Sequence, residues 1–266
     1  MEKDRLIGFI KKLGSAAVAF SGGVDSSVVC KAAYLALGGR AVAVTVASEL
    51  VPERDVADAA RVAEAIGIRH AVARVNALEN ERVASNPPER CYHCKSDDFS
   101  AIRDKAREFG IDIILDGTNA DDPKGHRPGI RALGELGVIS PLMELGYTKA
   151  DVRLLAEEFD LPNASKPSSP CLASRFPYGQ RLTAEGIGRV REAEEFLFSL
   201  GFKELRVRDH GGIARIELDA AALPLAAEAG VRQKIVAKLL SIGYNYVTLD
   251  LEGFRSGSMD RDLEPR

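Results

Sequence analysis

The most constraining feature of this sequence is a short segment rich in glycine and serine between an apolar run and a helical pattern. Residues 16–20 are small and apolar, which predicts a buried strand, and residues 24–37 carry apolar side chains at helical spacing. The segment 21–27, hereafter the glycine loop, therefore forms a strand-to-helix turn. Its glycines allow a ligand to approach the backbone, and the first N–H groups of the helix have no partner within it. The glycine loop predicts a phosphate site.

The side chains of the glycine loop also suit a nucleotide. A carboxylate beside a bound phosphate is repelled unless a divalent cation lies between them or it caps the helix, so we expect Asp25 to bind Mg²⁺ or to order the loop. The loop lacks the Lys-Ser or Lys-Thr pair of a Walker A motif. An ordinary glycine turn with serine caps is the alternative. The expected nucleotide-binding residues here are Ser21, Gly22, Gly23, Asp25 and Ser26.

Strand and helix patterns alternate along the chain after the glycine loop. The expected strands are 41–46, 70–75, 111–115 and 138–141. This alternation predicts an α/β domain with a parallel sheet. Ligands of such sheets collect beyond the carboxyl ends of the strands. Ser48, after the second strand, and the polar loop 116–123 are therefore expected beside the glycine loop, with adenine near Ser48 and Asp121 as a further candidate contributor.

The 266 residues suffice for two domains. We expect an α/β domain over 1–180, which ends in an irregular, proline-rich stretch of the kind that forms ordered functional loops. Residues 181–266 show a helix, two strand patterns, two further helices and a last strand, which predicts a small α+β domain for substrate binding or assembly. The tail from residue 253 is expected to fray.

Two of the four cysteines form a Cys-x-x-Cys pair. Cys91 and Cys94 lie on a predicted helix and share one of its faces. Such a pair can be a redox dithiol, a zinc half-site or an iron–sulfur half-site. The surrounding pattern is not thioredoxin-like, and no second Cys-x-x-Cys completes a zinc site. Two thiols that only pack between helices are the remaining alternative.

Cys171 lies in the irregular stretch and is the candidate nucleophile. Lys166 and Arg175 are close to it in sequence, and positive charge lowers the pKa of a thiol and favours the nucleophilic thiolate. A buried cysteine without a chemical role is the alternative. Arg206 and Arg208 alternate on a predicted strand, so they share a face and can bind a phosphate or carboxylate, with ion pairing as the alternative.

Composition narrows the possible partners. The net charge is −3 and both signs are interspersed, so no basic stripe indicates a nucleic-acid partner. The charged first residues do not resemble a signal peptide, and no apolar run reaches membrane-spanning length. Cysteines in such a chain are expected to be thiols or metal ligands rather than a disulfide framework. We expect a cytoplasmic protein without a membrane partner.

The glycine loop, Ser-Gly-Gly-Val-Asp-Ser-Ser, resembles the SGGxDS signature of the PP-loop ATP pyrophosphatase superfamily. That resemblance implies cleavage of ATP between its α- and β-phosphates, which gives an adenylated substrate and pyrophosphate. With segments 91–95, 117–122, 166–167, 170–175 and 206–208, nearly the whole chain resembles the LarE family. These ATP-dependent sulfur transferases build the nickel-pincer nucleotide cofactor of lactate racemase.

The resemblance implies a reaction and a set of residues. ATP adenylates a carboxylate of pyridinium-3,5-biscarboxylic acid mononucleotide, and a sulfur species displaces AMP to leave a thiocarboxylate. In the family's sacrificial version, the thiolate that matches Cys171 attacks the acyl adenylate, and elimination leaves dehydroalanine in the protein. Arg206 and Arg208 match the family's substrate-phosphate region. Ser174 and Arg175 lie beside the nucleophile and are expected to bind substrate.

The sequence departs from the family's single-cysteine pattern, because Cys91 and Cys94 accompany Cys171. Three thiolates suit a 4Fe-4S cluster with one open iron, since such clusters normally take four. This resembles the three-cysteine LarE subgroup and certain tRNA thiolases, in which the cluster delivers sulfur. We therefore expect ATP, Mg²⁺ and a 4Fe-4S cluster as cofactors, with sacrificial donation from Cys171 or a tRNA thiolase as alternatives. The expected partners are the nucleotide substrate, a sulfur donor protein and identical subunits.

Overall fold

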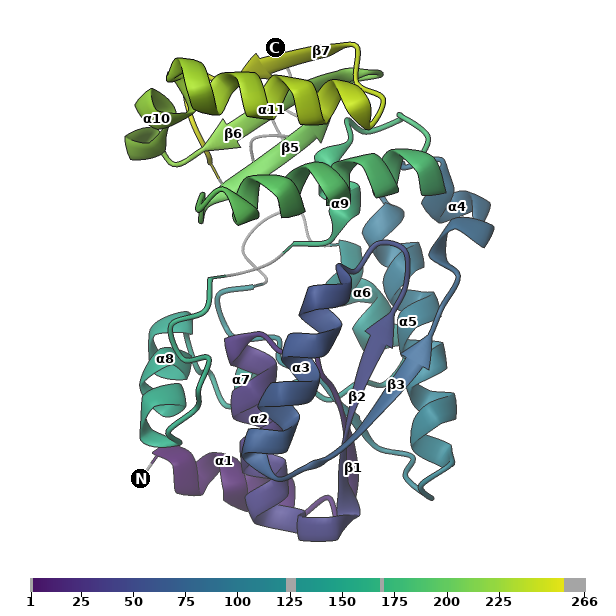
Figure 1. Cartoon of the computed structure of the whole chain (residues 1–266). Coiled ribbons are helices and arrows are strands. Elements are labelled where there is room, and N and C mark those ends of the chain that lie inside the picture. Colours follow the sequence, from purple (N-terminus) through teal and green to yellow (C-terminus); the bar gives the residue numbers. More distant parts are fainter. Residues whose placement is uncertain (1, 123–127, 168–169, 256–266) are drawn as a thin grey trace. The chain divides into compact units, whose positions relative to one another are not determined.

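The computed structural model describes residues 2–122, 128–167 and 170–255 (Figure 1). Its contacts divide the chain into two compact units. The first unit comprises Met1–Ala77 and Glu89–Ser169, and the second unit comprises Leu78–Pro88 and Pro170–Arg266. The second unit resumes at Pro170, ten residues before the domain boundary expected at residue 180. The expected functional domains, 1–180 and 181–266, stay a prediction. From residue 256 onward, the tail expected to fray lies outside the described residues.

The first unit contains a parallel sheet of four strands in the order β3-β2-β1-β4. The strands are β1 (Ala16–Ala19), β2 (Ala41–Ala47), β3 (Arg69–Arg74) and β4 (Ile114–Leu115). This confirms the predicted α/β class with a parallel sheet. The strand expected over 138–141 is reduced to one bridge between Leu115 and Ile139. Pro141 follows and begins a short helix, α7 (Pro141–Glu144), because proline has no N–H to offer a strand partner.

Helices cover both faces of this sheet, which explains why its central strands β1 and β2 are almost wholly apolar, whereas the edge strand β3 contains two arginines and a histidine. Ala41 and Ala43 of β2 face one core, and Val42 and Val44 face the other. The first core is covered by α1 (Glu2–Lys11), α2 (Val24–Leu37), α3 (Glu53–Ile66) and α8 (Lys149–Glu158). The second is covered by α5 (Arg90–Arg107) and α6 (Pro128–Glu135) (Figure 1).

The second unit is built on a separate sheet of three strands, β5 (Leu205–Asp209), β6 (Ile213–Leu218) and β7 (Tyr246–Leu249). β5 and β6 form an antiparallel hairpin, and β7 runs parallel to β6. The predicted small sheet in the C-terminal region is thus confirmed. Its helices are α4 (Glu81–Ala84), α9 (Ala184–Ser199), α10 (Leu223–Ala227) and α11 (Ala229–Ser241). In the ranges that the structure describes, every helix is too short or too polar to span a bilayer.

Candidate active site

The glycine loop directly follows β1 and packs tightly against two other elements. Gly22 has a φ of +69°, and a Cβ atom there would lie 2.9 Å from Cα of Ala59 on α3. A Cβ atom on Gly117 would lie 2.7 Å from N of Ser26. Both positions therefore require glycine: the first for its backbone conformation and for space, the second for space. The packing fixes the loop between α3 and the segment after β4.

The loop leaves the start of α2 without a side-chain cap. Gly23 is the N-cap residue and makes no side-chain cap hydrogen bond. The hydroxyls of Ser26 and Ser27 instead donate to the Gly23 carbonyl, at 3.1 Å and 2.9 Å. Ser21 Oγ lies 3.2 Å from Ser26 Oγ. The first N–H groups of α2, with the positive end of the helix dipole, can therefore bind an anion such as a phosphate.

Asp25 contacts two residues that the sequence analysis did not select. Asn119 Nδ2 donates to Asp25 Oδ1 at 3.0 Å, and Lys149 forms an ion pair with Asp25 Oδ2. Lys149 is the first residue of α8, and its backbone N–H donates to Asp121 Oδ2 at 2.9 Å. Asp121 is thus placed beside the site, with its carboxylate used to anchor α8. Asn119 belongs to the polar loop that the sequence had placed here, whereas nothing in the sequence singles out Lys149.

The residues present fit an Mg²⁺ ion that arrives with a nucleotide. Mg²⁺ in proteins is commonly held by one or two carboxylates together with substrate phosphates, and Asp25 supplies a carboxylate at the glycine loop. In the structure, the oxygens of Asp25 contact Lys149 and Asn119. In the ranges the structure describes, no group of three or more His, Cys, Asp or Glu side chains is arranged as a metal site.

The backbone that enters the glycine loop is held by a relay of two side chains. Thr45 Oγ1 donates to the Phe20 carbonyl at 2.8 Å and lies 2.8 Å from His70 Nε2. Because the threonine hydrogen is used, His70 Nε2 is the donor. Burial lowers the pKa of His70, which favours the neutral ring. Ser48 lies directly after β2 and is half-buried, and its contact with adenine stays a prediction.

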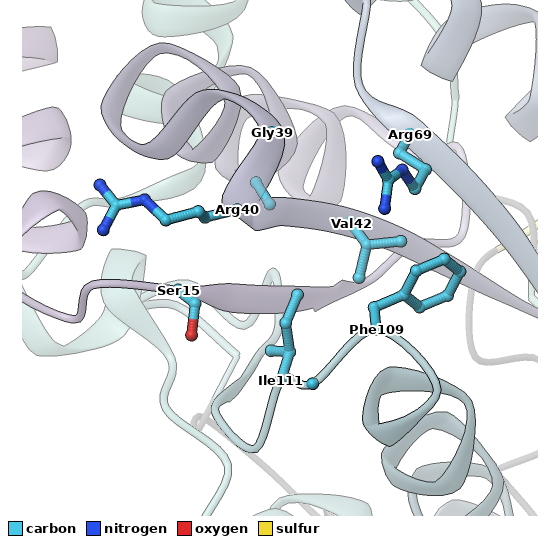
Figure 2. Close-up of a pocket in the computed structure, with 9 residues that line it drawn as sticks. Ser15, Gly39, Arg40, Val42, Arg69, Phe109 and Ile111 are labelled. Atoms are coloured by element: carbon cyan, nitrogen blue, oxygen red, sulfur yellow. The ribbon is translucent and has the colours of Figure 1, made fainter.

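A pocket of about 240 Å³ lies at the opposite edge of this sheet. Ser15, Ala41 and Arg69 border it, at or just before the amino ends of β1, β2 and β3. Figure 2 shows Val42 and Ile111 on its apolar side, with Arg40 directed away from them. The glycine loop follows the carboxyl end of β1, so this pocket is separate from the nucleotide site.

The Cys-x-x-Cys pair lies in the first turns of α5, with both thiols half-buried. Arg90 Nη2 lies 3.7 Å from Cys91 Sγ, and the Cys94 thiol donates to Asp98 Oδ2 at 3.6 Å. Burial raises the pKa of Asp98 to about 6. Its other oxygen, Oδ1, is buried without a hydrogen-bond partner among the described residues. Cys91 therefore lies beside a cation, and Cys94 lies beside a carboxylate. The two thiols are one turn of helix apart, which is the spacing of half of a cluster ligand set.

Cys171 lies in the second unit and its backbone is firmly held. Arg175 donates from Nη1 to the carbonyls of Pro170 at 2.8 Å and Cys171 at 3.1 Å. Ser174 Oγ also donates to the Cys171 carbonyl, at 2.9 Å. The Arg175 guanidinium is only 1 % exposed and forms a bidentate pair with Glu194, at 2.9 Å for both bonds. The charge of Arg175 is thus compensated, and this side chain orders the segment that presents the half-buried Cys171 thiol.

Lys166, the other cation close to Cys171 in sequence, belongs to the first unit. Its ammonium group pairs with Asp58 at 3.0 Å and lies 4.0 Å from Asp55, both on α3. The effect of Lys166 on the Cys171 thiol stays a prediction.

Arg206 and Arg208 of β5 differ in their surroundings. Arg208 is 4 % exposed, and its guanidinium donates to Glu217 Oε2 and to the Ser174 carbonyl, both at 2.7 Å. Arg206 is half-buried and lies 4.9 Å from the Phe254 ring. Burial, with the nearby Arg175 charge, lowers the pKa of Arg206 to about 10. Arg208 therefore links β5 to the Cys171 segment, and Arg206 is the more accessible cation.

Comparison with known proteins extends these observations. The model of the NAD synthase family matches residues 4–107, which include the glycine loop. An uncharacterized protein of Synechocystis sp. is 40% identical over 260 residues, which cover 98% of this chain and 97% of that protein. The pyridinium-3,5-bisthiocarboxylic acid mononucleotide synthase of Lactiplantibacillus plantarum is 40% identical over 263 residues, which cover 98% of this chain and 95% of that enzyme.

A more distant similarity covers part of the chain. The tRNA-specific 2-thiouridylase MnmA of Pelotomaculum thermopropionicum is 30% identical over 193 residues, which correspond to 57% of this chain and 53% of that enzyme. The similarity to the thiouridylase is partial, whereas the two relatives at 40% identity match over almost their whole length.

Proposed function

The chain belongs to the LarE family of PP-loop enzymes and is an ATP-dependent sulfurtransferase, and from this premise we propose that it acts on pyridinium-3,5-biscarboxylic acid mononucleotide. In this proposal, a carboxylate of that compound is adenylated and then converted to a thiocarboxylate for nickel-pincer cofactor synthesis. The observation that carries it is the uncapped start of α2 at the glycine loop, in a chain similar throughout to a bisthiocarboxylate synthase.

The first step is adenylation at the glycine loop. A carboxylate oxygen of the acceptor attacks the α-phosphorus of ATP, the bond to the β-phosphate oxygen breaks, and pyrophosphate leaves. The free N–H groups at the start of α2 stabilise the negative charge that accumulates on the leaving pyrophosphate. Lys149, paired with Asp25 at the same loop, adds a positive charge. Mg²⁺ bound through Asp25 would neutralise phosphate charge during this step.

The second step is sulfur transfer to the acyl adenylate. A sulfur nucleophile attacks the acyl carbon, the bond to the AMP oxygen breaks, and the thiocarboxylate and AMP are released. We assign the sulfur supply to a 4Fe-4S cluster held by Cys91, Cys94 and Cys171. Such a cluster would provide an iron without a protein ligand, where sulfide can bind. The proposal is supported by the two half-buried thiols one turn apart on α5 and by the half-buried thiol of Cys171.

Sacrificial donation is the second candidate, and the ordered Cys171 segment favours it. The Cys171 sulfur would attack the acyl carbon and expel AMP, which leaves a thioester. Loss of the Cα proton and cleavage of the Cβ–S bond would then release the thiocarboxylate and leave dehydroalanine. The backbone clamp on Cys171 by Ser174 and Arg175 suits a nucleophile that must be presented in one orientation.

Substrate recognition is proposed for the second unit. The expected substrate contacts are Ser174, Arg175, Arg206 and Arg208, and Arg206, with the more accessible guanidinium, is assigned to the substrate phosphate. Arg175 and Arg208 are buried and paired with Glu194 and Glu217, so with Ser174 they are proposed to act by ordering the Cys171 segment. Action on tRNA is a less supported alternative, because the thiouridylases match only part of the chain. A homo-oligomeric state, a sulfur donor protein and a cytoplasmic location stay predictions.

The test uses full-length protein purified without oxygen. With ATP, Mg²⁺ and pyridinium-3,5-biscarboxylic acid mononucleotide, we expect pyrophosphate release and a product in which sulfur replaces oxygen, detected by mass spectrometry. Iron and acid-labile sulfide are measured on the same protein and on Cys91→Ala, Cys94→Ala and Cys171→Ala. Pyrophosphate release with tRNA and not with the mononucleotide contradicts the proposed substrate. Protein that cannot be loaded with iron contradicts the cluster and favours sacrificial donation.

A further inference from the structure

Asn163 contacts the glycine loop from the segment that follows α8. Its side chain is 7 % exposed. The amide nitrogen Nδ2 donates to the Gly22 carbonyl and to Ser27 Oγ, both at 2.9 Å. A side-chain amide has two N–H donors, so both are used on this loop.

Ser27 extends this contact to the next peptide group. Its hydroxyl accepts from Asn163 and donates to the Gly23 carbonyl at 2.9 Å. Asn163 therefore holds two consecutive carbonyls, that of Gly22 directly and that of Gly23 through Ser27.

The direction of these carbonyls decides whether the loop can bind phosphate. In a planar trans peptide, the C=O and the following N–H point in opposite directions. With the carbonyls of Gly22 and Gly23 held toward Asn163 and Ser27, the N–H groups of Gly23 and Val24 point away from them, and the Gly23 N–H donates to Ser21 Oγ at 3.3 Å. A glycine pair can rotate these peptides with little steric resistance, which would turn a carbonyl oxygen toward the phosphate and repel it.

The orientation of the Asn163 amide is unambiguous. Its Oδ1 atom is buried and has no hydrogen-bond partner among the described residues. Exchange of Oδ1 and Nδ2 would place an acceptor against the Gly22 carbonyl and against a Ser27 hydroxyl whose hydrogen is already donated. A buried acceptor without a partner costs free energy, so the position uses an amide for its two donors.

We propose that Asn163 is a positioning residue for the phosphates of ATP: it fixes the peptide groups after Gly22 and Gly23 so that neither carbonyl oxygen turns toward the ligand. The inference rests on the proposed use of ATP at this loop. It extends the nucleotide site to a residue 141 positions from Gly22 in sequence, which no sequence motif links to the loop.

The test separates phosphate binding from binding of the nucleoside. Inorganic pyrophosphate, a non-hydrolysable ATP analogue and adenosine are titrated calorimetrically into wild-type protein, Asn163→Ala and Asn163→Asp. Loss of the two donors is expected to weaken pyrophosphate binding about tenfold in Asn163→Ala, with adenosine binding unchanged. Asn163→Asp is expected to lose more, since it adds a negative charge near the phosphate. In turnover, the KM for ATP rises and the KM for the acceptor does not.

A matched control and a second variant keep the test decisive. Asn80→Ala removes the side-chain acceptor that caps α4 in the second unit, so it should lower stability and leave pyrophosphate affinity unchanged. Ser27→Ala breaks only the relay to Gly23, and its effect should not add to that of Asn163→Ala.

The outcomes distinguish a failure of the proposed function from a failure of the role given to Asn163. Wild-type protein that binds neither pyrophosphate nor the ATP analogue overturns the proposed function. Folded Asn163→Ala that binds pyrophosphate like the wild type overturns this inference alone. If Asn163→Ala does not fold, unchanged pyrophosphate affinity in Ser27→Ala overturns the inference instead.

Discussion

Substitution of Gly22 by alanine is the sharpest test of the glycine-loop geometry. The residue has a φ of +69°, and a left-handed conformation costs an L-residue about 1–2 kcal/mol. The added Cβ would also lie 2.9 Å from Cα of Ala59, well inside ordinary contact. Overpacking of this kind costs about 1–3 kcal/mol. We therefore expect Gly22→Ala to lower the free energy of unfolding by about 2–5 kcal/mol.

Gly14→Ala is the matched control. Gly14 has a similar φ of +79°, but a Cβ atom there would have no neighbour within 4 Å. Equilibrium denaturation of both variants separates conformational strain from packing, because only Gly22→Ala carries both. Pyrophosphate affinity, titrated in parallel, should fall in Gly22→Ala alone. Equal stability losses in the two variants, with unchanged pyrophosphate affinity, would refute the description of the loop as packed against α3.

Three further predictions follow from charged and polar contacts. Lys149→Met removes the cation paired with Asp25, so binding of an ATP analogue should weaken about fivefold at low salt and less at high salt. A loss of affinity that does not depend on salt would contradict the electrostatic role of Lys149. His70 has a pKa lowered by burial, so the folded state disfavours its protonation; stability should be fully present above the unfolded pKa of about 6.5 and fall as the pH drops through it toward the lowered value. His70→Gln should remove that slope in pH-dependent denaturation, and an unchanged slope would assign the titration to another group. Arg175→Met leaves the Glu194 charge buried without its ion-pair partner and should lower the free energy of unfolding by about 3–5 kcal/mol. The double variant with Glu194→Met should be more stable than Arg175→Met, and thermal or chemical unfolding measures both.

Local patterns in the sequence were sufficient for much of the fold. The helix expected over 24–37 is α2, and the two threonines before α8 and α9, Thr148 and Thr183, both cap their helices through side-chain oxygens. The helix and both caps depend only on residues close together in the chain, so one sequence is enough to predict them. The helix α6 was not expected, because Gly129 and Gly134 lower its intrinsic propensity and its stability comes from packing against α5.

Contacts between distant parts of the chain could not be predicted in the same way. Asn163 and Lys149 reach the glycine loop from more than 120 positions away, and neither lies in a motif that points to it. Lys166 is close to Cys171 in sequence but pairs with Asp58 on α3. Proximity along the chain is a poor guide to charge pairing, because the fold decides which side chains share a surface.

The segment Leu78–Pro88 is a whole stretch of chain whose unit could not be predicted from its place in the sequence. It precedes the Cys-x-x-Cys helix in sequence but belongs to the second unit by its contacts. Leu182 N donates to the Ala84 carbonyl at 2.7 Å, and Gly179 N donates to the Asn86 carbonyl at 2.8 Å. Backbone hydrogen bonds of this kind leave no trace in composition or periodicity, so the sequence alone assigned the segment to the first domain.

The most direct test of the central claim is the number of thiocarboxylate groups formed per protein chain. Protein loaded with iron and sulfide without oxygen is incubated with ATP, Mg²⁺, pyridinium-3,5-biscarboxylic acid mononucleotide and added sulfide, and the product is counted by mass spectrometry. An ATP-dependent, cluster-supplied sulfurtransferase predicts several thiocarboxylates per chain and an unchanged mass of the protein. Product that stops at one per chain, with Cys171 converted to dehydroalanine, would contradict the cluster as the sulfur supply.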